Sequence, residues 1–386
     1  MSGVSKLDRR RFLKCSLCAA GGAILPQVLP GGSLLIPARS ASASPTQANL
    51  SHVEAKYYKK LEHKEIECVL CPRECKIGDR ERGYCGCRDN QNGIYYTLVH
   101  SRPCSVHRDP IEKKPLFHFL PGTDAFSIAT AGCNLNCKFC QNWEISQVRP
   151  EQVMAYDLSP EEVAAYAEQT GCRSIAYTYS EPIVFYEYML DCAVAGRRRG
   201  IRSVVITAGY VNHDPWLELI REVDAIKVDF KAFTEEFYRD ICCGELKPVM
   251  DALVDLAQSK IWYELVYLVV PTLNDNPSDI RRMSKWMVQE LGRDVPIHFT
   301  RFSPKYLLKN LPPTPVSSLE KAREIAQEEG MNFVYVGNVP GHKGEHTYCP
   351  GCRQVLIERI GYTIIQTNLQ DGKCKFCMKT IPGVWS

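Results

Sequence analysis

The chain has 386 residues, a net charge of +3 and 19 cysteines, and its apolar and charged fractions are those of a globular protein. The positive charge is concentrated at the front, because residues 1–43 hold six basic residues and one acidic residue, whereas residues 44–386 hold 41 basic and 43 acidic residues. A slightly acidic body lacks the basic surface that binds nucleic acid, so we expect no nucleic-acid partner.

The first 43 residues have the features of an export signal. "DRRRFLK" (8–14) is followed by an apolar stretch and by the small residues "ARSASAS" (38–44), and the Arg9–Arg10 pair resembles a twin-arginine signal peptide. The apolar stretch is short and broken by Gly and Pro, so we expect no transmembrane span in the mature chain. Export of this type predicts the periplasm or the cell exterior after folding in the cytoplasm. An unused signal would leave the chain in the cytoplasm.

The rest of the chain divides by composition into four parts. Residues 44–64 are expected to be a polar linker, 65–120 a Cys-rich module, 121–344 the main domain and 345–386 a second small module. Within the main domain, helical patterns alternate with seven apolar runs, at 125–130, 174–179, 203–207, 225–230, 262–270, 296–302 and 333–337. This alternation predicts an α/β fold with a parallel sheet, and the number of units favours a partial or full (β/α) barrel over a doubly wound sheet. "SPEE" (159–162) and "SSLE" (317–320) have the form of helix capping boxes.

Three cysteines, Cys133, Cys137 and Cys140, directly follow the first apolar run, with Phe139 before the last of them. An iron–sulfur cube takes four thiolates, one for each iron, so three cysteines leave one iron available. The carboxyl ends of barrel strands, where this loop lies, are the usual place for an active site. A zinc knuckle that lacks a ligand, or a cluster completed by a distant cysteine, is the structural alternative.

The spacing C-x3-C-x-aromatic-C resembles the signature of the radical S-adenosylmethionine (radical SAM) superfamily. The resemblance implies a barrel of radical SAM type and a [4Fe-4S] cluster whose open iron is chelated by the methionine part of SAM. In that superfamily the reduced cluster cleaves SAM to methionine and a 5′-deoxyadenosyl radical, which abstracts hydrogen from a substrate. The implied protein is a radical-generating oxidoreductase, with no catalytic residue assigned beyond the cluster and the SAM site.

Polar residues at the ends of the later apolar runs are candidates for contacts with SAM, in addition to Phe139. Glu181 in "YTYSEP" resembles the glutamate of the superfamily's Gly-Gly-Glu motif, and Thr207 in "TAGY" is expected to face the nucleoside. Asp229 and Lys231 in "DFK" resemble the Asp-Leu-Lys of glycyl-radical-enzyme activases. His298 is placed to hydrogen-bond the ribose.

Two further groups of cysteines flank the main domain. The C-terminal group has the spacing of a zinc ribbon, in which a closed set of four thiolates is structural. Its members are Cys349, Cys352, Cys374 and Cys377. We expect zinc there, with iron or an auxiliary cluster as the alternative. The candidates in the N-terminal group are Cys68, Cys71, Cys75 and Cys85. Cys85 is preferred to Cys87 as the fourth ligand because of the resemblance to related proteins. Thiolates suit both zinc and an auxiliary cluster, so the metal of this second group stays open.

Longer sequence motifs resemble those of one smaller group within the superfamily. "CVLCPREC" (68–75), "DPIEKKPLFHFLPG" (109–122), "GNVPGHKGEHTYCPGC" (337–352) and "IPGVW" (381–385) resemble the radical SAM enzyme of the AmmeMemoRadiSam system, a group similar to pyruvate formate-lyase activating enzyme. The resemblance implies AMMECR-type and Memo-type partner proteins, an electron donor and an unidentified protein or small-molecule substrate. A glycyl-radical-enzyme activating enzyme is the closest alternative. A non-catalytic iron–sulfur electron carrier is a more distant one, because it needs four protein ligands for each cluster and no SAM pocket.

Overall fold

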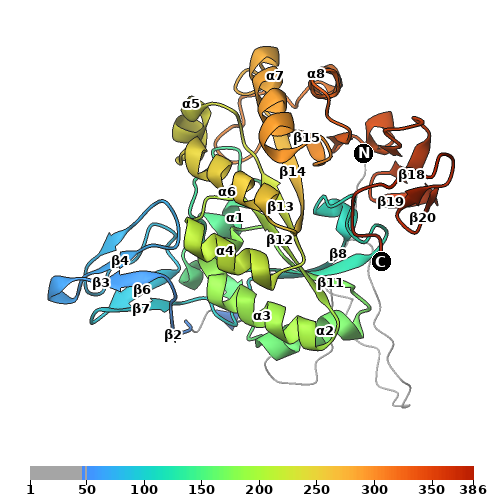
Figure 1. The fold of residues 1–386 in the computed structure, drawn as a ribbon. Helices are drawn as coiled ribbons and strands as arrows, with labels where there is room; N and C mark the ends of the chain where they lie inside the picture. The colour runs from blue at the N-terminus through green and yellow to red at the C-terminus, as the bar shows by residue number, and fades with distance from the viewer. Residues whose placement is uncertain (1–45, 48–49) are drawn as a thin grey trace, which may run out of the picture.

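The computed structural model describes residues 46–47 and 50–386, so the expected export signal at residues 1–43 lies outside the described residues. One large sheet with its helices forms the middle of the molecule (Figure 1). Small N-terminal sheets lie on one side of it and a small C-terminal module on the other (Figure 1). Among the described residues, no helix combines the length and the apolar character that a membrane span requires.

Seven strands of the large sheet are parallel and follow one another across it in sequence order. They are β9 (Asp124–Ala129), β11 (Ser174–Tyr177), β12 (Arg202–Thr207), β13 (Ala225–Asp229), β14 (Trp262–Val269), β15 (Ile297–Arg301) and β16 (Val334–Gly337). Each coincides with one of the seven predicted apolar runs, because strands covered on both faces need apolar residues at nearly every position. The sequential order excludes a doubly wound sheet.

The sheet is open at both sides. β8 (Ser105–Pro110), which lies in the range expected for the Cys-rich module, pairs antiparallel with β9 and forms one edge. β16 forms the other edge, and the described residues contain no pairing between the two edges. A fully closed barrel, one of the two predicted forms, is therefore not present in the described part of the chain.

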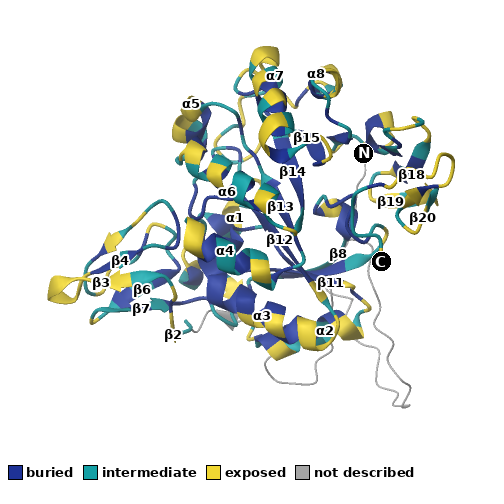
Figure 2. Ribbon diagram, in the orientation of Figure 1, coloured by how far each residue is buried: buried dark blue, intermediate teal, exposed yellow. Residues whose placement is uncertain are grey.

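Helices cover the sheet with their buried faces inward and their exposed faces outward (Figure 2). They are α1 (Trp143–Ser146), α2 (Pro160–Gln169), α3 (Tyr186–Arg198), α4 (His213–Glu222), α5 (Glu235–Phe237), α6 (Leu246–Gln258), α7 (Pro277–Trp286) and α8 (Val316–Glu328). The capping box at α2 is confirmed, because Glu162 N donates to Ser159 Oγ and the Glu162 carboxylate accepts from Ser159 N at 2.8 Å. The second predicted capping box is wrong, since α8 begins directly after Pro315 and Ser317 lies inside its first turn.

The small sheets lie at the two ends of the described chain. The N-terminal strands are β1 (Thr46–Gln47), β2 (Val53–Glu54), β3 (Tyr58–Lys60), β4 (Ile66–Cys68), β5 (Lys76–Ile77), β6 (Arg88–Gln91) and β7 (Ile94–Thr97), and β1 pairs with β10 (Met154–Ala155). The C-terminal strands are β17 (Thr347–Tyr348), β18 (Val355–Ile360), β19 (Thr363–Thr367), β20 (Leu369–Gln370) and β21 (Lys373–Cys374). The range 44–64, expected to be a linker, thus contributes β1, β2 and β3 to these sheets.

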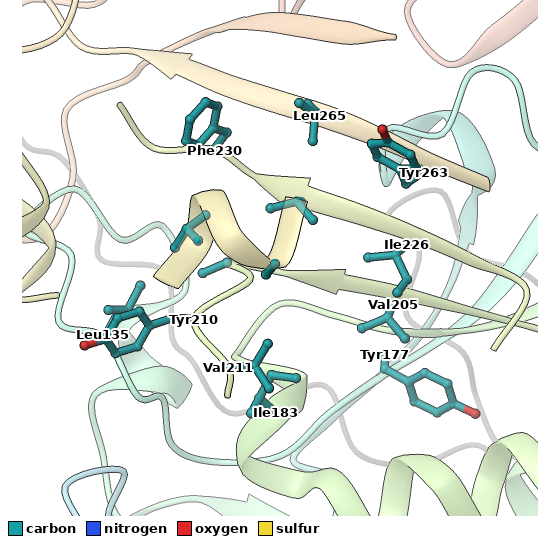
Figure 3. Packing of buried hydrophobic residues seen from close by; sticks show 14 of the residues in the cluster. Leu135, Tyr177, Ile183, Val205, Tyr210, Val211, Ile226, Phe230, Tyr263 and Leu265 are labelled. Atoms are coloured by element: carbon teal, nitrogen blue, oxygen red, sulfur yellow. The ribbon is translucent and has the colours of Figure 1, made fainter. Parts of the chain in front are cut away.

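The main core anchors the loop that follows β9. Leu135 of this loop is buried beside Tyr210 and belongs to the same cluster as the inward side chains of β12, β13 and β14 (Figure 3). Asn134 Nδ2 donates to Tyr210 O at 2.7 Å. A Cβ atom at Gly244 would lie only 2.5 Å from Leu135 Cδ2, so a larger residue there would force Leu135 to shift. The cysteine loop is therefore fixed by the packing of the core.

Candidate active site

The loop after β9 carries Cys133, Cys137 and Cys140 between two supporting segments. Its backbone donates from Asn136 N to Cys242 O at 3.0 Å and from Lys138 N to Ile241 O at 2.9 Å. On the other side, Cys140 Sγ lies 3.2 Å from Ser146 Oγ at the end of α1. Among the described residues, the three thiols do not belong to any group of ligand atoms that all lie within 4.8 Å of one another. They are therefore spread more widely than the ligands of a single ion.

A cavity of about 460 Å³ opens beside this loop. All three cysteines and Phe139 line it, together with residues from the carboxyl ends of the parallel strands. The predicted SAM-site residues among them are Glu181, Asp229, Lys231 and His298. The structure thus brings these side chains together on one cavity, at the edge of the sheet where parallel α/β folds bind ligands.

Glu181 is buried and held by three donors. It follows β11 and precedes the short helix η4 (Pro182–Phe185), and its carboxylate accepts from Thr207 Oγ1 at 2.5 Å, Ala208 N at 2.9 Å and Ile183 N at 3.2 Å. Burial raises the pKa of Glu181, and these hydrogen bonds work in the opposite direction. Thr207 itself does not line the cavity. Its hydroxyl fixes Glu181 rather than facing a ligand.

Tyr179, two residues before Glu181, has a backbone conformation that is typical of glycine. Tyr179 has a φ of +65°, a conformation that glycine adopts at little cost. Its hydroxyl donates to Asp109, and its carbonyl accepts from Asn142 Nδ2 at 2.9 Å. These contacts hold a non-glycine residue in the left-handed region.

Asp229 and two lysines form a compact charged group at the end of β13. Lys231 Nζ lies 3.1 Å from Asp229 Oδ2, and Lys227 Nζ contacts Oδ1 of the same carboxylate. Burial alone would raise the pKa of Asp229, but the two ammonium groups lower it to about 2. Lys231 also lies 5.9 Å from the centroid of the Phe139 ring. This contact places a cation next to the cysteine loop.

His298 is fully buried, lines the cavity and belongs to a hydrogen-bonded network. Its Nε2 lies 2.7 Å from Glu264 Oε2, and the carboxylate also accepts from the backbone of Phe117 and His118. Burial would raise the pKa of Glu264, but its hydrogen bond to His298 lowers it, while burial lowers the pKa of His298. The Glu264 carboxylate can only accept, so Nε2 of His298 is the donor in this hydrogen bond. Its Nδ1 is a buried acceptor without a partner among the described residues.

Several cavity residues were not among the sequence candidates. Lys227 was hidden inside an apolar run, although the period of two in a strand puts it on the same face as Asp229. Glu112, whose Oε2 is buried without a partner, and Lys114 come from the segment after β8. Tyr362 reaches the cavity from the C-terminal module. No spacing rule links such distant segments, so only the fold could place them.

The C-terminal cysteines form a compact group of four thiols within 4.8 Å of one another. Cys349 and Cys377 lie 3.6 Å apart, and Cys352 and Cys374 lie 3.7 Å apart. A tetrahedral zinc site with Zn–S bonds of about 2.3 Å requires S···S distances of about 3.8 Å. The group that was predicted from the spacing could therefore hold one metal ion. The N-terminal cysteines form no such compact group in the described chain.

Comparison with known proteins identifies the family. The sequence profile of the Radical SAM superfamily matches residues 127–287, which include the cysteine loop and the strand ends from β11 to β13. The chain is also 44% identical over 330 residues to an uncharacterised protein of Methanocaldococcus jannaschii, across 85% of this chain and 98% of that protein. The chain belongs to the radical SAM superfamily. Members of this superfamily are enzymes that catalyse radical reactions.

Two further similarities concern activating enzymes. This radical SAM protein is 24% identical over 162 residues to the pyruvate formate-lyase-activating enzyme of Clostridium pasteurianum, across 40% of this chain and 65% of that enzyme. Among solved structures, a domain of a pyruvate-formate lyase-activating enzyme from Bacteroides vulgatus aligns with a TM-score of 0.39 and 14% identity, across 43% of this chain and 99% of that domain.

Proposed function

We propose that this radical SAM protein holds a [4Fe-4S] cluster on Cys133, Cys137 and Cys140 and binds SAM in the adjoining cavity. The observation that carries the proposal is the meeting of three widely spaced thiols with Glu181, Asp229 and Lys231 on one cavity. When bound, the reduced cluster supplies the electron that cleaves SAM and so provides the radical for hydrogen abstraction.

The residues of the chain bind and orient SAM in this proposal. Glu181, held by three donors, presents a fixed carboxylate to the methionine ammonium, and Lys231 offers its cation to the methionine carboxylate. The unpartnered Nδ1 of His298 is an acceptor suited to a ribose hydroxyl, since Glu264 keeps the proton on Nε2. Asp229 holds Lys231 in place and offsets part of its charge.

Replacing Glu181 by Gln is expected to weaken SAM binding about tenfold or more. The amide lacks the negative charge that attracts the methionine ammonium. Its NH2 group would also face Thr207 or Ala208, which donate hydrogen bonds to the carboxylate in the wild type. Isothermal titration of the anaerobically reconstituted protein with SAM measures the dissociation constant. The exposed Glu161→Gln on α2 is the control and should bind SAM like the wild type. Unchanged affinity in Glu181→Gln would contradict the assignment.

The substrate side of the proposal rests on the resemblance to the AmmeMemoRadiSam enzyme. We infer an unidentified protein or small-molecule substrate that is processed together with AMMECR-type and Memo-type proteins, with a separate electron donor. Adding purified AMMECR-type and Memo-type proteins from the same organism should increase the yield of 5′-deoxyadenosine above that of the enzyme with SAM and dithionite alone. An unchanged yield would count against these partners.

The second candidate is a glycyl-radical-enzyme activating enzyme. It is favoured by the similarity to the activating enzyme of C. pasteurianum and by Asp229 and Lys231 at the end of β13. Incubation with SAM, reductant and a pyruvate formate-lyase would then produce a glycyl radical that is detectable by electron paramagnetic resonance (EPR). No such signal is expected if the AMMECR-type and Memo-type partners are the right ones.

We propose zinc as the ion of the C-terminal group, because its thiols already lie at the spacing of a tetrahedral site. Cys352→Ala is expected to lower the zinc content by about one ion per chain and to destabilise the C-terminal module. The visible spectrum of the cluster on the β9 loop should stay unchanged. Metal analysis and limited proteolysis measure both effects. A wild-type protein that is purified without zinc would contradict the proposal.

A further inference from the structure

Four cysteines of the N-terminal module line a second, small cavity. Cys68 ends β4, the next two follow in the turn before β5, and the fourth lies between β5 and β6; the four are Cys68, Cys71, Cys75 and Cys85. The turn is closed by Cys68 N donating to Cys75 O at 2.9 Å and Glu74 N donating to Cys71 O at 3.1 Å. Cys87 does not line this cavity, and its Sγ lies 3.8 Å from Val184 O.

The spacing of these thiols differs from that of the C-terminal group. The C-terminal thiols lie as close together as one zinc ion requires. Among the described residues, the N-terminal thiols line a common cavity, but no three of them all lie within 4.8 Å of one another. A four-iron cluster needs this wider arrangement, because each thiolate binds a different iron at a corner of the cube. The three cysteines of the β9 loop are spread in the same manner. The N-terminal set therefore resembles a cluster site rather than a single-ion site.

A buried arginine on the same cavity has an unused donor. Arg88 is 1% exposed, and its Nε donates to Val184 O at 3.1 Å and its Nη2 to Glu187 Oε2 at 2.5 Å. Its Nη1 is buried and has no partner among the described residues. Buried donors are nearly always satisfied in proteins. A thiolate or a cluster sulfide in the cavity would accept this hydrogen bond, and the guanidinium would offset part of its negative charge.

The second cavity shares a wall with the radical SAM loop. Arg73 lines the cavity, and its Nε donates to Asn134 O at 2.9 Å, within the loop that carries Cys133. Gly132 packs so closely that a Cβ atom there would lie 2.7 Å from Cys85 O. The two cysteine sites are therefore in direct contact through the backbone.

We propose that Cys68, Cys71, Cys75 and Cys85 hold a second iron–sulfur cluster of the four-iron type rather than a zinc ion. All four irons have protein ligands, so this cluster has no open position for SAM, and its chemistry is the uptake and release of one electron. This inference does not depend on the function proposed for the β9 loop.

The test uses a variant that keeps the N-terminal set intact. Cys133, Cys137 and Cys140 are all replaced by Ala, the full chain is reconstituted anaerobically, and iron, sulfide and zinc are counted for each chain. We expect about four irons and about four sulfides to remain, with an EPR signal after reduction that does not change when SAM is added. An iron content clearly below four, with or without additional zinc, overturns the proposal.

Two control variants distinguish a cluster that is bound by the N-terminal cysteines from iron that is bound nonspecifically. Adding Cys68→Ser and Cys71→Ser to the triple variant should remove the remaining iron, whereas adding Cys104→Ser should leave it in place. Retention of about four irons after the first addition overturns the proposal. Circular dichroism and the zinc content of the C-terminal group show whether each variant is folded. A lack of 5′-deoxyadenosine from the wild type would refute the proposed function without affecting this iron count.

Discussion

Cys137→Ala is expected to abolish the cluster of the β9 loop and the production of 5′-deoxyadenosine. Two remaining thiols, Cys133 and Cys140, cannot hold three corners of a cube, so this site should lose about four irons per chain. The activity should fall below detection, because the chemistry depends on the cluster rather than on an acid or base of the protein. Iron analysis, the visible spectrum and chromatography of the nucleoside products measure the effect.

The control for this substitution is Cys104→Ala, which removes a thiol that belongs to none of the three cysteine groups. It should leave both the iron content and the product yield unchanged. A Cys137→Ala protein that still forms 5′-deoxyadenosine from SAM would show that another residue completes the site, and the assignment of the loop would fail.

Asp229→Asn is expected to destabilise the protein by about 3 kcal/mol, because it leaves two buried ammonium groups without their shared carboxylate. The side chains of Lys227 and Lys231 are 5% and 13% exposed, so water cannot replace the lost partner. Urea unfolding of the cluster-free wild type and of the cluster-free variant measures the difference between their free energies of unfolding. The control is Asp251→Asn on α6, whose pair with Lys247 is exposed and should contribute less than about 1 kcal/mol.

The effect of Asp229→Asn should depend on pH in a defined direction. The pKa of Asp229 is about 2 in the folded chain, below the ordinary value of 3.8. A carboxyl group with a depressed pKa stabilises the folded state above its ordinary pKa, and this stabilisation is lost as the pH falls toward the folded value. The difference between wild type and Asp229→Asn should therefore be constant from pH 6 to about 4 and shrink toward pH 2. A difference that grows as the pH falls would contradict the ion-pair geometry.

The parallel strands were predictable because burial on both faces leaves an unmistakable apolar run. The edge strand β8 was not predictable from the sequence. Its residues, "SVHRDP", need to be apolar on one side only, and its charged positions resemble those of a loop. Whether the sheet closes could not be predicted either. Closure depends on the geometry of the last strands, and seven sequential strands are compatible with both an open and a closed sheet.

The candidate site was partly predictable from the same strands. Glu181, Asp229 and Lys231 stand at strand ends, and the fold brings them to one cavity. Glu264 was also predictable in part, because a lone glutamate inside "WYELVYLVV" is rarely buried without a partner, and here it pairs with His298. The contribution of Tyr362 from the C-terminal module depends on tertiary packing between segments far apart in the sequence, which no local pattern encodes.

The most direct test of the account is the cleavage of SAM by the wild-type protein. The chain is reconstituted anaerobically, its cluster is shown by EPR to be intact and reducible, and SAM is added with dithionite. We expect 5′-deoxyadenosine and methionine in equal amounts, and neither product without reductant. If neither product forms although the cluster is reduced and SAM is present, the central claim of radical SAM chemistry at the β9 loop is contradicted.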